Sequence, residues 1–411
     1  MELKDIISDF PLSHIAERHS PLVRQEEFGG VLYWPFLNTQ FHLLNKSGFD
    51  TAKRLIDRNF KFEFPVEVAL IRKLASKSLS PKGFKQTGNI PSAKWHSGKF
   101  KSPLYVLLEI TSLCSFHCDY CFNMKNMSSI QHIEVDKIFS ILDEFKDMEI
   151  FHVVLSGGDP IEHPNINQIL SRLKYNGITS TVITKSGYSK IIKTLSVLPD
   201  NFIFSLDSMN EDRFDSVVKK NGAHKNLMKA VTEFSKTGSS VMISAAIEKH
   251  EFNKIEELFD FSVNNTVDKI RIRPILDCNS GQRLNSSIKE SWSIGDLELI
   301  RDSTIKYSNN ILIDISPFFA IFNSDTIFPY CLDCKAGKFY TKIMSSGNVV
   351  PCSVLDDTVI DNILIQSFVS IWNNEHNWKE FRSDRVPVCS LRQQFTTSGV
   401  ARRSVEDDVI S

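Results

Sequence analysis

The stretch Leu104-Tyr-Val-Leu-Leu-Glu-Ile110 leads through Thr-Ser-Leu into Cys114-Ser-Phe-His-Cys118-Asp-Tyr-Cys121. The first part is apolar and predicts a buried β-strand, and the second places three thiols on one short loop. Thiolates are the usual ligands of iron–sulfur clusters, and a four-iron cluster offers four irons for ligation. Three cysteines leave one of these irons without a protein ligand. Such an open iron indicates a catalytic site.

Strands and helices alternate from residue 103 to about residue 316. The predicted strands are 104–110, 150–155, 178–183, 202–206, 240–247 and 268–273, and the predicted helices are 135–147, 164–176, 188–197, 222–236, 251–264 and 294–307. This order is typical of parallel βα units with right-handed crossovers. Six units are too few for an eight-stranded barrel, so we expect an α/β fold with a partial, open (βα)₆ barrel. The cysteine loop would follow the first strand, at the strand ends where such barrels carry their active sites.

The spacing of the three cysteines after the first strand of a βα fold resembles the cysteine motif of the radical S-adenosylmethionine (SAM) enzymes. The resemblance implies that Cys114, Cys118 and Cys121 hold a [4Fe-4S] cluster whose open iron binds the amino and carboxylate groups of SAM. One electron would then cleave SAM to a 5′-deoxyadenosyl radical. Without the βα context, the same cysteine run could be a fragment of a zinc site.

The resemblance also implies residues for a SAM pocket. The backbone of Tyr120 would approach the adenine. Gly157, Gly158 and Asp159 resemble the Gly-Gly-Glu-Pro motif that receives the SAM amino group, with Asp159 in the place of Glu. Two glycines let a backbone approach a ligand closely.

Further SAM contacts are expected on later strands. Ser205 and Asp207 resemble a fourth-strand Ser-x-Asp segment that would meet the ribose hydroxyls. Thr184 is a candidate for lining the site, although Ser186 replaces the Asn found in relatives. On the sixth strand we expect only one of Arg271 and Arg273 to face the interior, and we prefer Arg273 as a contact for the SAM carboxylate; a surface ion pair is the alternative.

Four cysteines lie in residues 317–411. Cys334-Lys-Ala-Gly337 and Pro351-Cys352 resemble the C-terminal extension called SPASM, and no cysteine follows Cys389. This resembles the shorter, single-cluster version called a twitch domain. Cys331, Cys334, Cys352 and Cys389 would ligate an auxiliary [4Fe-4S] cluster, with a structural zinc ion as the alternative. The Gly and Pro pattern between 337 and 352 predicts a hairpin, and Cys278 is expected to be an inert thiol.

Residues 1–95 predict short strands around a turn near Asn38-Thr39, then helices at about 48–58 and 65–78. This suggests a small winged-helix-like α+β module that resembles the PqqD-like recognition element of peptide-modifying enzymes. Such modules bind a leader peptide as an added strand. A stabilising domain or a DNA-binding winged helix are the alternatives. We place the barrel at 100–316 and the C-terminal domain at 317–411.

Composition gives broad limits. The 411 residues are 42% hydrophobic and carry a formal net charge of −1, which argues against a nucleic-acid partner. No apolar run of membrane-spanning length and no signal peptide are seen, so we expect a cytoplasmic protein without a membrane partner.

These expectations combine into one hypothesis. The chain would be a radical SAM enzyme that binds the leader of a ribosomally made precursor peptide and modifies its core, most simply by forming a cross-link. An electron donor such as flavodoxin or ferredoxin would be a second partner. A radical SAM enzyme acting on a small molecule in cofactor biosynthesis, a peptide epimerase and a non-catalytic metal protein remain open alternatives.

Overall fold

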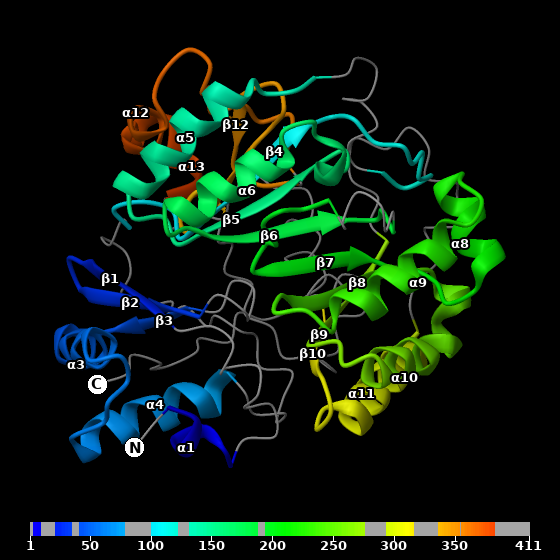
Figure 1. Cartoon of the computed structure of the whole chain (residues 1–411), viewed down its shortest axis with the longest axis horizontal. Coiled ribbons are helices and arrows are strands. Elements are labelled where there is room, and N and C mark those ends of the chain that lie inside the picture. The colour runs from blue at the N-terminus through cyan, green and yellow to red at the C-terminus, as the bar shows by residue number, and fades with distance from the viewer. Residues whose placement is uncertain are drawn as a thin grey trace.

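The computed structural model describes residues 3–9, 21–34, 41–78, 100–121, 131–187, 194–275, 293–315, 336–353 and 355–382. These residues form a ten-stranded sheet, a three-stranded sheet and the helices that cover them. Figure 1 shows the large sheet behind its outer helices, with the small sheet to one side. The predicted turn at Asn38-Thr39 and most of the predicted helix 188–197 lie outside the described residues.

A row of parallel strands forms the centre of the large sheet. The six predicted strands are present close to their predicted bounds, as β4 (Tyr105–Thr111), β5 (His152–Gly157), β6 (Thr179–Thr184), β7 (Asn201–Ser205), β8 (Ser240–Ile247) and β9 (Lys269–Pro274). Each pairs in parallel with the next. An unpredicted strand, β10 (Leu312–Ile315), adds in parallel beyond β9. The predicted α/β fold with a partial parallel barrel is confirmed.

Helices cover the outer face of this row. They are α5 (Val135–Asp147), α6 (Ile166–Tyr175), α8 (Glu211–Val218), α9 (Ala223–Phe234), α10 (Ile255–Asn264) and α11 (Ile294–Tyr307), with the short 3₁₀ helices η3 (Pro160–Glu162) and η4 (Lys249–Lys254). Successive strand residues point to opposite faces. Val106, Leu108 and Ile110 of β4 therefore join the core under the helices, which leaves Leu107 and Glu109 for the barrel interior.

The C-terminal extension continues the large sheet beyond β4. It contains β11 (Tyr340–Ile343), β12 (Asn348–Val350), β13 (Asp361–Asn362), α12 (Phe368–Asn373) and α13 (Glu375–Arg382). Strand β11 pairs in parallel with β4. It also forms an antiparallel hairpin with β12, and this hairpin was predicted. Gly347 has a φ of +83° in this hairpin turn, a conformation that favours glycine.

A buried charge cluster connects the extension to the barrel. The ammonium of Lys342 on β11 lies 2.7 Å from Glu109 on β4 and 2.8 Å from Asp356, which follows Cys352. The side chains of Lys342 and Glu109 are only 3% and 4% exposed. Burial alone would lower the pKa of Lys342, but the two carboxylates outweigh it and raise that pKa. We call these three residues the C-terminal joint.

The N-terminal module begins with α1 (Leu3–Ile7) and continues with β1 (Leu22–Glu26), β2 (Gly29–Tyr33), β3 (Phe41–Leu44), α3 (Lys46–Asp57) and α4 (Pro65–Ser78). Its strands form an antiparallel sheet in the order β1-β2-β3. One face of the sheet packs on the helices through Leu32, Leu44 and Leu55. This arrangement agrees with the predicted small α+β module.

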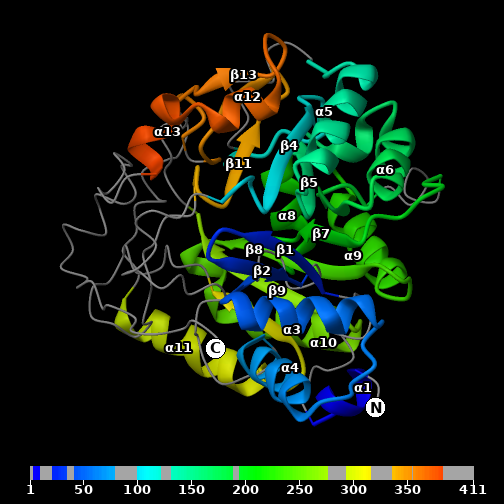
Figure 2. The same ribbon diagram turned by 90° about the vertical axis from the view of Figure 1, so that its left-hand side faces the viewer.

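The other face of the module packs against the start of the barrel strands (Figure 2). Tyr33 stacks on Phe151, which immediately precedes β5, with ring centroids 5.4 Å apart, and Phe41 stacks on Phe339 at 4.8 Å. Because the cysteine loop follows the opposite end of β4, the module covers the barrel end that lies away from it.

A second buried cation lies at this contact. The guanidinium of Arg24 on β1 pairs with Glu26 and donates to the carbonyl oxygens of Ser102, Pro103 and Glu149 at 2.9 to 3.2 Å. Its side chain is fully buried. These contacts, which we call the N-terminal joint, fasten the module to the chain segments that enter β4 and β5.

Candidate functional site

The cysteine loop lies at the C-terminal end of β4, as predicted. Cys118 is buried, and Cys114 and Cys121 are partly exposed. The loop is held by its backbone, because His117 N donates to Val218 O at 3.1 Å and Asp119 N to Val217 O at 3.2 Å. The end of α8, a helix that the sequence analysis missed, therefore positions the loop.

The thiols of this loop lie in a poorly solvated environment. Burial raises the pKa of Cys118 to about 11, while the nearby ammonium of Lys185 opposes this rise. The pKa of Cys114 is raised as well, first by burial and then by the carboxylate of Asp159. The thiols of Cys114 and Cys118 are therefore protonated near neutral pH, and a bound metal must displace these protons. Among the residues described, no three ligand side chains converge on a position for a single metal ion.

Gly157 and Gly158 end β5 against the cysteine loop. Gly157 has a φ of +131°, and a Cβ on either glycine would lie 2.0 Å from a carbonyl oxygen of the Thr111–Leu113 segment. Gly158 N donates to Thr111 O at 2.7 Å. We expected these glycines to admit a ligand. In the structure they admit the backbone of Thr111–Leu113, which leads into the cysteine loop, and so fix this segment to β5; their contact with a ligand stays a prediction.

The side chain of Asp159 is buried. Its carboxylate accepts hydrogen bonds from the Thr184 hydroxyl at 2.8 Å and from the Ser186 amide at 3.1 Å. Burial raises the pKa of Asp159 to about 6. Asp159 and Thr184 thus join the ends of β5 and β6 beside the cysteine loop.

The structure adds Lys185, which sequence reasoning missed, to the predicted residues Tyr120 and Asp207. The Lys185 ammonium pairs with Asp207 and lies 3.0 Å from the Tyr120 hydroxyl, which itself donates to Asp207. The second Asp207 oxygen accepts from Ala246 N on β8 at 2.8 Å. The sequence signal was a lysine directly after the apolar strand that ends at Thr184. Ser205, also predicted, is partly exposed at the end of β7.

Arg273, one residue before the end of β9, lies on the same side of the sheet as Arg271. Ile270 and Ile272, which alternate with the two arginines, belong to the outer core, and residues two apart on a strand share a face. The prediction that only one arginine can face the interior is wrong for this reason. Arg271 is paired with Asp314 at 2.8 Å. The buried Nε of Arg273 has no hydrogen-bond partner among the residues described, and its charge acts on Tyr120.

Of the remaining cysteines considered in the sequence analysis, the structure describes only Cys352. Cys352 is buried after β12, whereas Cys278, Cys331, Cys334 and Cys389 lie outside the described residues. Cys352 O accepts from Leu355 N at 3.2 Å, so the same turn carries Asp356 to the C-terminal joint.

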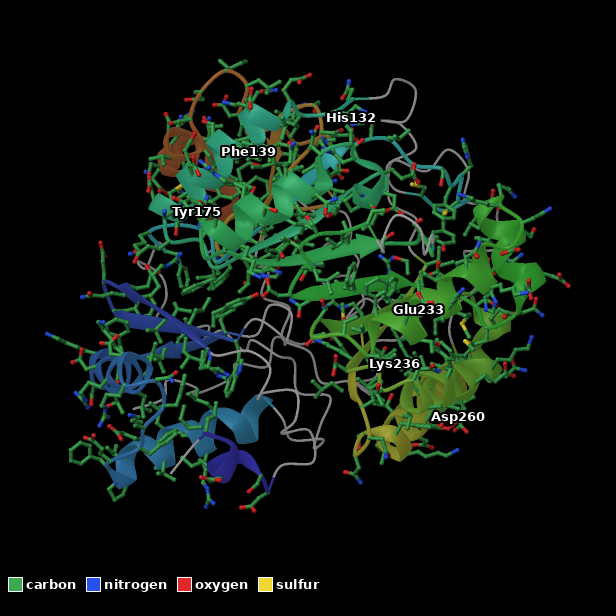
Figure 3. The ribbon with its side chains drawn as sticks, viewed as in Figure 1. His132, Phe139, Tyr175, Glu233, Lys236 and Asp260 are labelled. Atoms are coloured by element: carbon green, nitrogen blue, oxygen red, sulfur yellow. The ribbon has the colours of Figure 1, made fainter. Side chains whose placement is uncertain are left out.

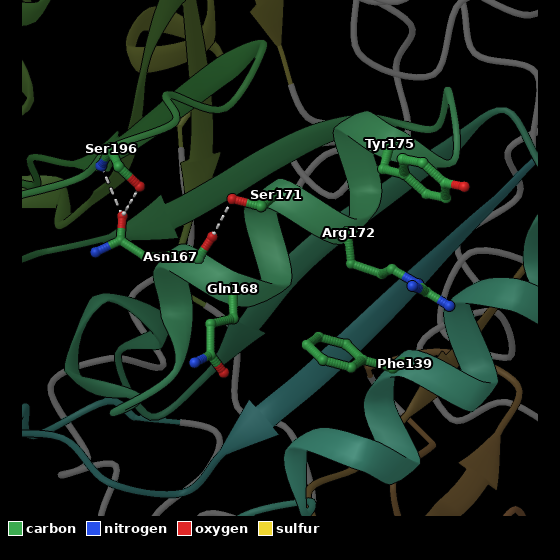
Figure 4. A pocket seen from close by; sticks show the side chains of 7 residues that line it. All are labelled: Phe139, Asn167, Gln168, Ser171, Arg172, Tyr175 and Ser196. Carbon is green, nitrogen blue, oxygen red and sulfur yellow. Dashed lines mark hydrogen bonds between the residues drawn. The ribbon is translucent and has the colours of Figure 1, made fainter.

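An open groove of about 400 Å³ lies elsewhere, between α5 and α6 on the outer face (Figure 4). It is lined by Phe139, Asn167, Gln168, Ser171, Arg172, Tyr175 and Ser196. Figure 3 shows Phe139 and Tyr175 on the outer helices. None of the predicted site residues contributes to this groove. No described helix is long and apolar enough to cross a membrane.

In comparisons with known proteins, two segments of the chain match models of protein families. Residues 108–262 match the model of the Radical SAM superfamily, and residues 331–392 match that of SPASM, an iron-sulfur cluster-binding domain. The first match contains the cysteine loop, the second half of β4 and the whole of the parallel strands β5 to β8. The second contains all four cysteines predicted for the auxiliary site.

Among curated relatives, the PqqA peptide cyclase of Xanthomonas euvesicatoria pv. vesicatoria is 21% identical over 294 residues, which cover 68% of this chain and 77% of the relative. The antilisterial bacteriocin subtilosin biosynthesis protein AlbA of Bacillus subtilis is 21% identical over 317 residues, covering 74% and 67%. Streptococcus suis SuiB bound to precursor peptide SuiA is similar in fold, with a TM-score of 0.65 at 17% identity, over 91% of this chain and 93% of that one.

Proposed function

We propose that this chain, a radical SAM enzyme with [4Fe-4S] clusters and SAM as cofactors, modifies a ribosomally synthesised precursor peptide by forming a cross-link. The observation that carries the proposal is its similarity to a peptide cyclase and to a bacteriocin biosynthesis protein over two thirds or more of its length. The fold similarity to SuiB, which is described in complex with its precursor peptide, extends to nine tenths of the chain.

The cysteine loop fits a cluster with one open iron. Its three thiols are presented by one backbone-anchored loop beside two glycines that leave no space for side chains. When bound, the cluster and SAM supply a 5′-deoxyadenosyl radical that can take a hydrogen atom from the peptide. We assign Cys114, Cys118 and Cys121 to this cluster, and Cys331, Cys334, Cys352 and Cys389 to the auxiliary cluster.

The chain's own contribution is to place these groups and to limit access to them. Tyr120, Lys185 and Asp207 tie the cysteine loop to the ends of β6 and β7. At the opposite end, Tyr33 and Phe41 of the module form an aromatic seal with Phe151 and Phe339. A reactive carbon radical must be shielded from stray hydrogen donors, and this seal excludes water from that end of the barrel.

We assign the leader-binding role to the N-terminal module, as a PqqD-like recognition element. Strand β3 is an edge of the small sheet and, among the described strands, pairs only with β2. An extended peptide can add to such an edge through backbone hydrogen bonds. The precursor peptide would then be the partner of the module, and flavodoxin or ferredoxin the electron donor of the clusters.

The test uses the reconstituted full chain with SAM, a reductant and a precursor peptide encoded beside its gene. We expect 5′-deoxyadenosine and a peptide that has lost two hydrogen atoms for each cross-link. Loss of two hydrogens distinguishes a cross-link from epimerisation, which leaves the peptide mass unchanged. SAM cleavage without any change in candidate peptides, but with turnover of a small molecule, would overturn the peptide assignment.

Deleting the module would be a poor test of leader binding, because it would expose the aromatic face of the barrel. We instead compare Leu43→Pro on β3 with Gln25→Pro on β1, the opposite edge of the same sheet. The two-residue turn after Glu26 makes Glu26 and Gly29 a hydrogen-bonded pair, so by alternation the N–H groups of Gln25 and Leu43 both point away from β2. Proline removes one strand N–H in each case. We expect Leu43→Pro to weaken binding of a labelled leader at least about tenfold, a loss of about 1.4 kcal/mol. Equal losses in both variants would contradict recognition at β3.

A further inference from the structure

The Lys185–Asp207 pair is the buried ion pair of the candidate site. The two side chains are 13% and 8% exposed, and they come from the segments that follow β6 and β7. The Lys185 ammonium also lies 5.4 Å from the ring centroids of Tyr120 and Phe214. Since Tyr120 stands between Cys118 and Cys121, this places a cation and an anion directly against the cysteine loop.

Asp119 of the same loop forms a second lysine–aspartate pair, which is exposed, with Lys219 at the end of α8. Lys219 and Asp119 are 2.9 Å apart, with side chains 50% and 57% exposed. Asp119 directly follows Cys118, so both pairs touch the same part of the loop. The chain therefore contains a natural contrast between a buried and a solvated pair at one cluster site.

We propose that the Lys185–Asp207 pair sets the reduction potential of the SAM-binding cluster. The potentials of iron–sulfur clusters depend on net charge, hydrogen bonding and solvent exposure around the cluster. Charges in the interior act through a low effective dielectric constant, whereas exposed charges are screened by water and salt. The proposal rests on the radical SAM assignment and is independent of the peptide substrate.

The sign of each effect follows from charge. Reduction adds an electron to the cluster, so a neighbouring cation favours it and a neighbouring anion opposes it. Removing Lys185 leaves the carboxylate of Asp207 and should lower the potential. Removing the charge of Asp207 leaves the ammonium and should raise it. A role limited to loop packing would give shifts of one sign or none.

The experiment is a redox titration of the reconstituted full chain without SAM, followed by electron paramagnetic resonance. The cluster signal is first assigned in the wild type by its change when SAM is added. We expect Lys185→Met to lower the midpoint potential, Asp207→Asn to raise it, and the double variant to lie close to the wild type. The matched controls Lys219→Met and Asp119→Asn should shift it much less, because their pair is solvated.

Two further readouts keep the test decisive. Lys185→Arg retains the charge and should keep the wild-type potential, while iron content and circular dichroism report whether each variant folds and takes up its clusters. If Lys185→Met fails to take up the cluster, Asp207→Asn and Lys185→Arg decide the question. Shifts of the same sign in the two single variants, an unchanged potential in Asp207→Asn, or equal shifts in the exposed pair would overturn the proposal.

Discussion

The two joints attach the flanking segments to the barrel, and they differ in how the buried cation of each joint is paired. Each buries a cation, Arg24 at the N-terminal joint and Lys342 at the C-terminal joint. Arg24 takes its carboxylate from its own strand and reaches the barrel through backbone carbonyls. Lys342 takes one carboxylate from the barrel itself. The first joint is therefore neutral and depends on backbone geometry, whereas the second depends on a barrel side chain and carries net negative charge.

The largest effect is expected for Lys342→Met. This change leaves Glu109 and Asp356 as neighbouring carboxylates in a buried site, and removal of one partner of a buried pair costs about 3–5 kcal/mol. We expect urea denaturation to show a decrease in the free energy of unfolding near the upper end of this range. Lys53→Met, at an exposed pair, is the control and should cost no more than about 0.5 kcal/mol. A loss as small as that of the control would show that the C-terminal joint contributes no stability.

A smaller loss, about 3 kcal/mol, is expected for Arg24→Met. Only one carboxylate is left, and Glu26 keeps a hydrogen bond from Lys101 N at 3.1 Å. Thermal and urea denaturation measure the loss. The double variant Arg24→Met with Glu26→Gln should recover part of it, because no charge is then left unpaired. If the double variant loses more than the single one, charge neutrality does not explain the joint.

Alkaline pH should weaken the two joints unequally. The folded-state pKa of Lys342 is raised above 10.5, so its contribution is complete below pH 10.5 and is lost as pH rises through the folded value. Burial lowers the pKa of Arg24 from its usual value and Glu26 opposes this, but a guanidinium stays protonated in this range. We expect the wild type to lose part of its advantage over Lys342→Met as the pH rises above about 10.5, and to keep its advantage over Arg24→Met. Parallel pH profiles for the two comparisons would contradict this difference.

The smallest effect is expected for Lys101→Met, beside the N-terminal joint. Lys101 pairs with Glu149 with both side chains exposed, at 43% and 59%, so solvent screens the attraction. We expect a change of no more than about 0.5 kcal/mol in urea denaturation. A larger loss would mean that the N-terminal joint extends to the surface.

Local sequence signals predicted most of the barrel. Helices 65–78, 135–147 and 294–307 are present with the predicted bounds. Proline begins the first of these helices, and a capping box of Ser293 and Asp296 precedes the third, so their N-terminal signals lie within a few residues of sequence. Helix α8 was missed because its eight residues are mostly polar and only Phe214 and Val218 are buried.

Features that depend on tertiary pairing could not be predicted in the same way. Strands β10 and β11 flank the six predicted parallel strands by pairing with β9 and β4, which are distant in sequence. In the candidate site, Tyr120, Lys185 and Asp207 come from three different loops. Family resemblance suggested Tyr120 and Asp207 but gave no reason to consider Lys185, because its role depends on a contact that only the fold creates.

The aromatic seal has a consequence for engineering. Under the leader-binding role proposed for the N-terminal module, exchanging the first 78 residues for the corresponding part of a relative would direct the enzyme to a new leader sequence. In this protein the exchanged part also supplies Arg24, Tyr33 and Phe41 to the barrel contact. A functional chimera must therefore keep the barrel-facing side of the sheet and alter only its β3 edge, so that the proposed recognition surface changes and the aromatic contact with the barrel does not.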